Sequence, residues 1–385
     1  MALPAPVGDW NDEQKALRKG LQKYYEALNA GVLEDDAAER FNRDKWQLIR
    51  ESGVIRISFA EQWGGLGHDA LTLVYVLEEL GYGCRDAGLL FALATQVVSA
   101  AIPLQKFGSE ELKERYLARL IDGEIISAHA ISEPSAGSDA MAMSTTATPD
   151  GDGYVLNGGK TFITNGPIAD VITVYAKLET GDGASGITAF LVPTDTPGFH
   201  VGPPIAKLGL NTCPFCELEF TDCRVPASNI VGKPGAGFFI LEHVMNWEIL
   251  CIFIMMAGEM QERMERCIAH VKKRTAFDVP IASNQYVAGK IVDQKIGIET
   301  SRKHLYDTAR RFAKGRSVTT EVSMAKLVTS EANLASALSA VQLFGGRGYM
   351  REYGMEKGLR DAVGAPIYSG TNEMQRVRIA SMLGL

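Results

Sequence analysis

The first third of the chain carries apolar residues at helical spacing. In residues 13–28 the apolar side chains recur three or four positions apart, which is the pattern of a helix with one face in a core. Residues 71–80 and 87–102 show the same pattern, and the glycine-rich residues 63–67 interrupt it as a loop would. The chain from about residue 12 to residue 122 is therefore predicted to be mostly helical.

Near residue 125 the helical period ends and short strand-like runs replace it. Residues 154–156 and 160–164 predict two strands joined by a turn at Asn157-Gly158-Gly159. Strands this short and this closely spaced favour an antiparallel sandwich or barrel. The further strand candidates are residues 126–131, 171–178, 186–192 and 217–220.

From residue 238 onward long helical patterns return without an internal proline. Because helical, β and helical blocks follow one another without alternating, the pattern predicts an α+β fold with separately built layers. The helix candidates are residues 238–270, 283–314, 320–343 and 373–383.

These changes of pattern predict three domains, and 385 residues are enough for two or three. We expect an N-terminal all-α domain at residues 1–124, a middle β domain at residues 125–236 and a C-terminal α-helical bundle domain at residues 237–385.

The composition and net charge of the chain argue against some classes of binding partner. A chain with 46% hydrophobic and 22% charged residues can bury a large core. Its net charge of -7 argues against a nucleic-acid partner, because phosphate binding needs a concentrated basic surface. The first ten residues show no signal-peptide pattern, and the longest strongly apolar stretch, 249–258, is shorter than the roughly 17–25 residues of a membrane span. We expect a cytoplasmic protein without a membrane partner.

Two of the six cysteines, Cys213 and Cys216, have the spacing of a redox pair or of half a metal site. A zinc site needs a second pair of ligands, which Cys223 alone does not supply. We therefore predict no metal site, and expect these cysteines to be buried or partly exposed thiols.

Two loops offer the groups that a planar, anionic ligand needs. Ser132-Glu-Pro-Ser-Ala-Gly-Ser-Asp139 follows a strand-like run and can present backbone N–H groups and hydroxyls. Thr161-Phe-Ile-Thr-Asn-Gly166 offers an aromatic ring and a hydroxyl before another turn. Either loop alone would be an ordinary hairpin turn, but together they match a flavin, which needs a surface to stack on and hydrogen-bond donors.

Five motifs, in this order, resemble those of the acyl-CoA dehydrogenases, and the resemblance covers essentially the whole chain. It implies an N-terminal helical domain, a middle antiparallel β domain and a C-terminal four-helix bundle, with FAD between the last two. The motifs are Ile131-Ser-Glu-Pro-Ser-Ala-Gly-Ser-Asp139, Gly159-Lys-Thr-Phe-Ile-Thr-Asn-Gly166, Arg274-Thr-Ala-Phe277, Gln342-Leu-Phe-Gly-Gly-Arg-Gly-Tyr349 and Ile367-Tyr-Ser-Gly-Thr-Asn372.

The resemblance also implies which residues hold FAD, some of them in a neighbouring subunit. That sharing implies at least a dimer, and in this family a homotetramer built as a dimer of dimers. The residues expected at the flavin ring and pyrophosphate are Ile131, Ser132, Gly137 and Ser138, with Phe162 and Thr164 beside the isoalloxazine. Those expected to reach a neighbour's FAD are Arg274, Phe277, Gln285, Gln342, Gly345 and Gly346, and those near its adenosine part are Thr371 and Glu373.

The family's reaction needs a general base for the α-proton and the flavin N5 to take hydride from the β-carbon. Many relatives carry the base as a glutamate in the C-terminal Tyr-Glu-Gly-Thr loop, where this chain has Ser369. A serine hydroxyl cannot be that base at neutral pH, and the sequence shows no partner to activate it. Either the chain is inactive or its base lies elsewhere.

Glu248 is the candidate base. It is the one charged residue between His243 and Glu259, and at helical spacing it shares a stripe with apolar residues such as Val244 and Ile252. An apolar setting makes a carboxylate a better proton acceptor. From periodicity alone, Glu248 could equally lie on a narrow exposed strip or pair with a distant lysine.

The resemblance favours Glu248, because the isovaleryl and long-chain branches of the family place their catalytic glutamate at the matching position. Those branches often follow it with arginine, whereas this chain has Ile249, which puts a local charge partner in doubt. His129 and His243 flank the candidate site segments, although a lone histidine is more often structural than catalytic.

Ser369 together with Asn246-Trp-Glu248 is similar to the prolyl-carrier-protein dehydrogenases, which oxidise a prolyl thioester on a phosphopantetheine arm in secondary-metabolite biosynthesis. Residues 164–171 and 213–216 also resemble that group. The resemblance implies a carrier protein as partner and an electron acceptor that reoxidises the flavin. The alternatives are a short- or branched-chain acyl-CoA dehydrogenase, a flavin monooxygenase of the same fold, or a non-enzymatic carrier-protein-binding module.

Overall fold

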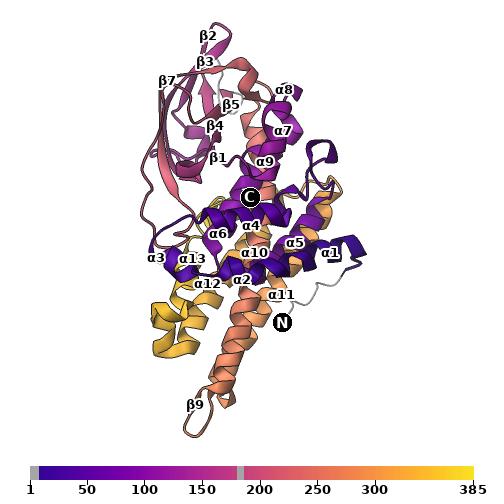
Figure 1. The fold of residues 1–385 in the computed structure, drawn as a ribbon, viewed down its shortest axis with the longest axis vertical. Coiled ribbons are helices and arrows are strands. Elements are labelled where there is room, and N and C mark those ends of the chain that lie inside the picture. The colour runs from indigo at the N-terminus through magenta and orange to yellow at the C-terminus, as the bar shows by residue number, and fades with distance from the viewer. Residues whose placement is uncertain (1–7, 180–185) are drawn as a thin grey trace.

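The computed structural model describes residues 8–179 and 186–385. Figure 1 shows a β domain at one end of the molecule, helices across its middle and a long helical hairpin projecting from the other end. The predicted α+β architecture is confirmed. We propose domain boundaries near residues 125 and 237, because a helix ends at Asp122, the first strand begins at Ser127 and the long C-terminal helix begins at Gly237.

The N-terminal part consists of short and medium helices. The predicted single helix at 13–28 is wrong, because a 3-10 turn at Leu21–Tyr24, directly after Gly20, separates two helices. The predicted helix at 87–102 is also divided, by a π turn at Val97–Ala101 that precedes Pro103. The helices are α1 (Asp12–Gly20), α2 (Tyr25–Asn29), α3 (Val32–Ala37), α4 (Arg43–Ser52), α5 (Ala70–Gly83), α6 (Ala87–Gln96), α7 (Ile102–Phe107), α8 (Glu110–Leu112) and α9 (Ala118–Asp122).

The β domain is one curled sheet with the path β6-β7-β3-β2-β4-β5-β8, and β1 lies beside β4. Most neighbours are antiparallel, as predicted, but β4 pairs with both β1 and β2 in parallel. The strands are β1 (Ser127–Ala130), β2 (Thr146–Asp150), β3 (Gly153–Thr164), β4 (Val171–Leu178), β5 (Ile187–Pro193), β6 (Phe199–Val201), β7 (Phe215–Pro226) and β8 (Ile230–Val231).

The two strands predicted around Asn157-Gly158-Gly159 are one continuous strand, β3. The glycines form a bulge: the pairing of β3 with β7 shifts register between Leu156 and Gly158. Gly158 has a φ of +140°, and a Cβ there would lie 2.7 Å from the Cα of Thr145. An Asn-Gly pair therefore serves here as an irregularity within a strand and not as a hairpin turn.

The two faces of the sheet bury different cores. Ile172 and Val174 on β4 point into the interior of the β domain. Val171 and Tyr175, on the opposite face, pack with the helices. Because His129 on β1 pairs with Thr173 on β4, both side chains belong to this helix-facing side of the sheet.

The C-terminal part is a bundle of long helices. The four predicted helices are confirmed within three residues at each end, and the sequence pattern missed the short α13. Its elements are α10 (Gly237–Lys273), the hairpin strands β9 (Thr275–Ala276) and β10 (Val279–Pro280), α11 (Gln285–Ala313), α12 (Thr319–Phe344), α13 (Met355–Val363) and α14 (Asn372–Met382).

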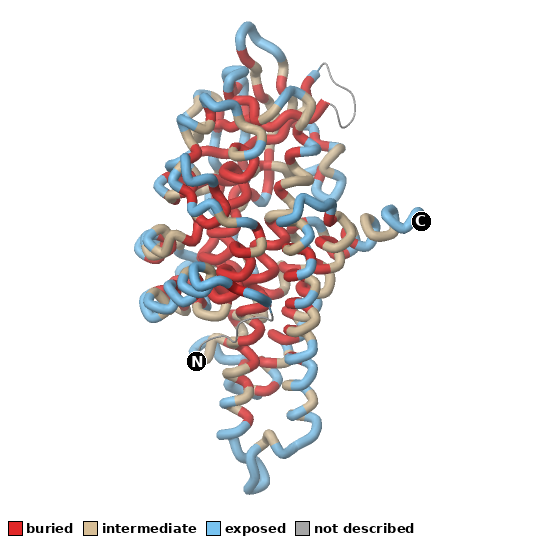
Figure 2. Tube along the Cα trace, turned by 90° about the vertical axis from the view of Figure 1, so that its right-hand side faces the viewer, coloured by how far each residue is buried: buried red, intermediate tan, exposed pale blue. Residues whose placement is uncertain are grey.

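Helix α10 spans much of the molecule's length. Its 37 residues extend about 55 Å. The middle of the helix, residues 248–264, is mostly buried, whereas the hairpin that follows the helix is exposed (Figure 2). Gly81 of α5 allows its close crossing with α10, because a Cβ on Gly81 would lie 2.1 Å from the Met255 carbonyl oxygen. A Cβ on Gly258 of α10 would likewise lie 2.1 Å from the Glu78 carbonyl oxygen of α5.

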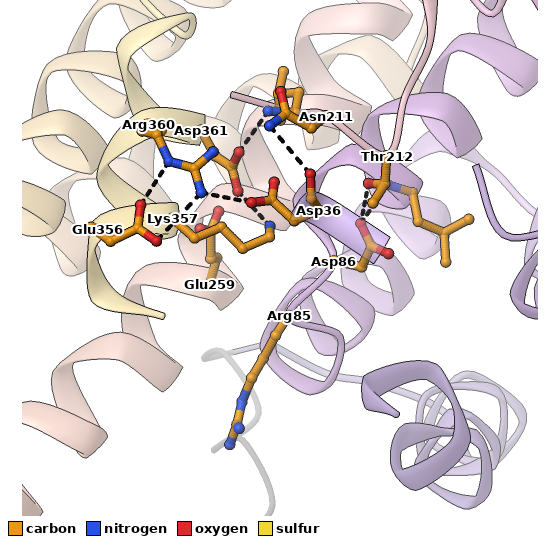
Figure 3. A network of polar contacts seen from close by, with 12 residues as sticks. Asp36, Arg85, Asp86, Asn211, Thr212, Glu259, Glu356, Lys357, Arg360 and Asp361 are labelled. Carbon is orange, nitrogen blue, oxygen red and sulfur yellow. Dashed lines mark hydrogen bonds and ion pairs between the residues drawn. The ribbon is translucent and has the colours of Figure 1, made fainter. Parts of the chain in front are cut away.

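A polar network joins the N-terminal helices, a loop of the β domain and α13 (Figure 3). The Leu210 N–H donates to Asp361 at 2.6 Å, and Lys357 donates to the same carboxylate at 2.7 Å. Arg360 donates to Asp36 at 2.6 Å. These bonds fix the three parts of the chain relative to one another beside Glu259 of α10.

Two described stretches are long and apolar enough to span a membrane, Ala87–Phe107 and Gly237–Lys273. The prediction from the ten-residue run missed them, because isolated polar residues interrupt a run without making a longer window polar. Their most apolar windows are 94% and 56% buried within the protein, and core helices commonly pass the same test. Residues 1–7, part of the segment searched for a signal pattern, lie outside the described residues.

Candidate active site

A buried carboxylate anchors the first candidate flavin loop. Glu133 accepts hydrogen bonds from the Ser144 hydroxyl at 2.7 Å, the Thr145 N–H at 2.9 Å and the Lys160 amine at 2.9 Å. Lys160 and the hydrogen bonds to its oxygens lower the pKa of Glu133 to about 2 against the opposing effect of burial. The stabilisation is therefore complete above the ordinary value near 4.5 and is lost as pH falls toward 2.

The two candidate flavin loops meet, as the sequence led us to expect. The Thr161 N–H donates to the Ser132 carbonyl at 2.9 Å, and the Lys160 amine donates to the Ile131 carbonyl at 3.1 Å. Phe162, with a φ of +59°, is in a conformation that bulky residues avoid. Its ring is 65% exposed beside this junction. Ile131, Ser132, Gly137 and Ser138 thus lie in one loop next to the strand that carries Phe162 and Thr164.

Replacing Glu133 by Gln is expected to weaken FAD binding about tenfold. The amide cannot accept from Lys160 and two backbone N–H groups with the strength of a carboxylate, which costs about 1–2 kcal/mol of loop order. Fluorescence titration of the apoprotein with FAD measures the dissociation constant. An unchanged constant would contradict the role of this loop. The exposed Asp222→Asn, on β7, is the control.

Glu248 lies on the buried half of α10 and is 8% exposed. Its Oε1 accepts a hydrogen bond of 2.5 Å from the Ser369 hydroxyl. Its Oε2 lies 3.4 Å from Nε2 of His129 on β1 and has no hydrogen-bond partner among the described residues. The structure therefore corrects one expectation: Ser369 has a partner, and that partner is the candidate base.

The C-terminal loop that carries Ser369 is held rigidly. Ser369 has a φ of +55°, and the Gln375 side chain donates to its carbonyl at 3.0 Å. Thr371 caps α14 by accepting from the Met374 N–H at 3.2 Å, and Glu373 lies exposed in the first turn of that helix. The loop thus places Ser369 against Glu248, and Thr371 and Glu373 at the start of α14.

The tyrosine hydroxyls and the cysteine thiol around Glu248 stay protonated and neutral. Burial, and then the charge of Glu248, raise the pKa of Tyr175 on β4 and of Cys251 on α10. Burial is also the main cause that raises the pKa of Tyr368, beside Ser369. The hydroxyls of Tyr175 and Tyr368 have no hydrogen-bond partner in the part of the chain that the structure describes. The neighbouring hydroxyls and the thiol therefore do not compete with Glu248 as bases.

A small cavity of about 30 Å³ lies one to three turns further along α10 from Glu248. Its walls are mainly apolar, with a few polar groups, and its volume corresponds to about one water molecule. It is lined by Ala87, Leu90, Phe91, Leu210, Ile252, Met255, Met256, Glu259, Asn333, Asp361 and Tyr368. A short or compact group fits this cavity better than a long acyl chain.

Three further candidates, Arg274, Phe277 and Gln285, lie at the tip of the α10–α11 hairpin, far from the β domain (Figure 1). Arg274 is about 40 Å from Glu248 along α10, at roughly 1.5 Å per residue. Phe277 is 99% exposed. Within one chain these residues do not join the site around Glu248.

Gln342, Gly345 and Gly346, at the end of α12, lie at the same end of the bundle as the hairpin. The Phe344 ring stacks on His270 of α10 with 4.1 Å between the ring centres. All three residues are exposed, and a Cβ on either glycine would meet no atom within 4 Å. The structure thus groups the residues expected at a neighbour's FAD on one exposed surface, apart from the site that contains Glu248.

The remaining sequence candidates have structural roles. His243 packs against Phe107, and Trp247 donates to it at 3.2 Å. Burial, and then Lys106, lower the pKa of His243 to about 4. Cys213 and Cys216 are buried free thiols, as predicted. Among the described residues no three His, Cys, Asp or Glu side chains form a group that could hold a metal ion.

The contact between His129 and Glu248 is the site feature that sequence reasoning did not find. His129 stands two positions before Ile131, the first residue of the candidate flavin motif, and that closeness was the one available signal. The partner in α10 is more than a hundred residues away in the chain, so no local pattern could connect the two.

The residues present fit a flavin. The exposed Phe162 ring offers a surface for stacking, and the loop with Ser132 and Ser138 offers hydroxyls and N–H groups. Gly137 lies in this loop with no atom within 4 Å of where a Cβ would stand, so a large ligand can approach the backbone. The unpartnered Oε2 of Glu248 gives the same site a proton acceptor.

Comparison with known proteins gives matches to the N-terminal, middle and C-terminal domains of acyl-CoA dehydrogenases, at residues 11–124, 128–223 and 235–384. The chain belongs to the acyl-CoA dehydrogenase family. Its matches within this family include both carrier-protein and CoA enzymes.

Among the relatives, the L-prolyl-[peptidyl-carrier protein] dehydrogenase of Pseudomonas fluorescens is 36% identical over 94% of this chain and 98% of its own length. The short-chain specific acyl-CoA dehydrogenase of Megasphaera elsdenii is 35% identical over 89% and 90%. Of solved structures, the prolyl acyl carrier protein oxidase AnaB has a TM-score of 0.95 at 39% identity, covering 98% of this chain and 100% of its own. PigA with FAD and proline has a TM-score of 0.95 at 35% identity, covering 99% and 100%.

Proposed function

We propose that this protein oxidises a prolyl group, held as a thioester on a carrier protein, by forming a double bond between its α and β carbons. The observation that carries the proposal is the pairing of Glu248 with Ser369. It places a buried carboxylate at the loop where many relatives carry their base. Two similar proteins, AnaB and the Pseudomonas fluorescens relative, are named for prolyl carrier proteins.

FAD is the cofactor of this enzyme. PigA, similar over nearly the whole chain, has been solved with FAD, and the loops around Ser132 and Phe162 fit the group. Ile131, Ser132, Gly137, Ser138, Phe162 and Thr164 would hold it in this chain. When bound, FAD supplies the acceptor that takes hydride from the β-carbon.

Glu248 takes the α-proton in this proposal. Ser369 donates to Oε1, which leaves Oε2, with its two lone pairs, as the oxygen that accepts the proton. A backbone N–H near Ser369 is expected to donate to the thioester carbonyl, which acidifies the α-hydrogen. The apolar side chains beyond Glu248, such as Phe91 and Ile252, exclude water from the reacting carbons.

The small cavity beyond Glu248 supports a compact acyl group. The cavity is small, about 30 Å³, and mainly apolar, which favours a compact acyl group over a long chain. It suits a short acyl-CoA equally well, so a short-chain acyl-CoA dehydrogenase is the second candidate. The short-chain enzyme of Megasphaera elsdenii also favours that alternative. A flavin monooxygenase of this fold would need no glutamate base, so the buried pairing of Glu248 with Ser369 argues against it.

The exposed apolar residues support assembly into a homotetramer. Phe277, Tyr286 and Tyr349 are 99%, 89% and 82% exposed in the single chain, near one end of the bundle. In the assembly the hairpin and the end of α12 would bring Arg274, Phe277, Gln285, Gln342, Gly345 and Gly346 to a neighbour's FAD, with Thr371 and Glu373 near its adenosine part. A cytoplasmic location stays a prediction.

Replacing Phe277 by Asp is expected to yield smaller assemblies with less bound flavin, because a charge at the hairpin tip opposes burial in an interface. Light scattering during size-exclusion chromatography, with flavin absorbance recorded on each peak, measures both quantities. The control is Lys314→Asp, which changes an exposed residue at the other end of α11. A tetramer with full flavin content in the Phe277 variant would contradict this arrangement.

Mass spectrometry of the carrier tests the proposed function. The enzyme is incubated with prolyl-loaded carrier protein and an artificial electron acceptor, and the intact carrier mass is followed. The expected result is a loss of hydrogen pairs from the prolyl group. An unchanged carrier, combined with oxidation of butyryl-CoA under the same conditions, would make the short-chain alternative correct.

A further inference from the structure

Two groups from different parts of the fold face the two oxygens of Glu248. Ser369, from the C-terminal loop, donates to Oε1 at 2.5 Å. His129, from β1, places Nε2 3.4 Å from Oε2. The side chains of Glu248 and His129 are 10% and 14% exposed. The carboxylate is thus set between the β domain and the end of the bundle.

Burying the His129 imidazole at this position destabilises the fold unless the side chain makes a compensating hydrogen bond. Its Nδ1 is buried without a hydrogen-bond partner among the described residues, and its strand neighbours Ala128 and Ala130 are apolar. Burial, the largest cause, lowers the pKa of His129, although the charge of Glu248 opposes it. A neutral imidazole carries one N–H, which can donate to one acceptor. The polar acceptor within reach of Nε2 is Oε2 of Glu248.

The other groups around Glu248 do not supply that donor. Tyr175 on β4, Cys251 on α10 and Tyr368 in the C-terminal loop feel its charge, but none of them is hydrogen-bonded to it. Lys326 on α12 donates instead to Asn372 at 2.8 Å and to the Pro366 carbonyl.

Two further elements packed against α10 carry charged groups with other partners: the Lys106 amine of α7 lies 3.2 Å from Nδ1 of His243, and Arg302 of α11 donates to Glu78. Helix α6, the π turn after it and strand β5 carry no titratable side chain. On α5, Glu78 lies further along α10, where its carbonyl approaches Gly258.

We propose that His129 is a positioning residue for Glu248: its neutral imidazole donates from Nε2 to Oε2 and stabilises the ionised carboxylate that accepts the α-proton. The inference rests on the proposed function, in which Glu248 is the base. Ser369 and His129 then hold the carboxylate from both sides. This arrangement takes the place of the arginine that often follows the base in related branches, where this chain has Ile249.

The test is the pH dependence of flavin reduction by saturating prolyl-carrier protein in the FAD-bound enzyme, measured by anaerobic rapid mixing. His129→Leu removes the donor, and His129→Gln keeps an N–H at similar reach. The Leu variant is expected to be about 10–100-fold slower near the lower pH limit of activity. Its acid limb is expected to move to higher pH, because an ionised carboxylate loses a donor. The Gln variant is expected to recover most of the rate, with KM unchanged in both.

The control variant is Thr173→Val, which alters the neighbouring buried position on β4 without removing a group that contacts Glu248. If His129→Leu does not fold, His129→Asn shortens the donor out of reach and takes its place. An acid limb that stays in position in these variants, or a Gln variant no faster than Leu, would overturn the inference. Failure of the wild-type enzyme to bleach with prolyl-carrier protein would instead contradict the proposed function.

Discussion

Replacing Glu248 by Gln abolishes flavin reduction, with an expected loss on the order of 10³–10⁴ in rate. The amide cannot accept the α-proton. The groups around it are the His129 imidazole, which is a donor to Glu248 in our proposal, and hydroxyls and a thiol whose pKa values are raised by burial. The variant should stay folded and yellow, because the amide oxygen still accepts from Ser369 in place of Oε1. Anaerobic rapid mixing with substrate, followed by flavin absorbance, measures the loss.

The matched control is Glu242→Gln, which changes a partly exposed glutamate on the same helix that faces Arg378 at 3.8 Å. It is expected to reduce its flavin at the wild-type rate. Ser369→Ala removes one hydrogen bond to the carboxylate and should cost far less than the loss of Glu248 itself, about tenfold to a hundredfold. A Glu248 variant that bleaches at the wild-type rate would show that the base lies elsewhere.

Replacing Glu78 by Gln should destabilise the protein more than any other substitution considered, by about 3–5 kcal/mol. Glu78 is fully buried on α5 and accepts from Arg302 at 2.5 Å, Tyr306 at 2.7 Å and Arg18 at 3.2 Å. The amide removes the carboxylate that two buried guanidinium groups share, so Arg18 keeps only Glu79, at 3.1 Å, and Arg302 keeps only Glu299, at 3.3 Å, among the described residues. Because Arg18 is on α1 and the other two residues are on α11, removing the Glu78 carboxylate weakens the contact between the N-terminal helices and the bundle.

Urea unfolding followed by circular dichroism measures this effect in the FAD-bound protein. The control is Glu321→Gln, which removes a partly exposed ion pair with Arg311 and should change stability by less than about 1 kcal/mol. An equal, small change in both variants would show that the buried cluster contributes little to holding the domains together.

The sequence predicted the long helices best, because an uninterrupted apolar period in α10, α11 and α12 leaves few alternatives. It failed where a local signal has two readings. The Asn157-Gly158 pair suits a hairpin turn and a bulge, and only the pairing of β3 with β7 decides between them. Helix α13 was missed because it is short and glycine precedes it.

The candidate site was predictable in its parts and not in its contacts. The resemblance identified Glu248 and the loop with Ser369, but read them as alternatives for one role. The structure brings them to 2.5 Å, across 121 positions of the chain, and adds His129 from a strand whose parallel pairing with β4 no periodicity reveals. Contacts between distant segments depend on how the layers pack, which a single sequence does not encode in any short window.

The most direct test of the proposed function is an anaerobic titration of the purified yellow protein, followed by flavin absorbance. Prolyl-loaded carrier protein and butyryl-CoA are added in separate experiments, with unloaded carrier protein as control. We predict that prolyl-carrier protein bleaches the flavin and that butyryl-CoA and unloaded carrier do not. Bleaching by butyryl-CoA with none by prolyl-carrier protein would contradict the assignment.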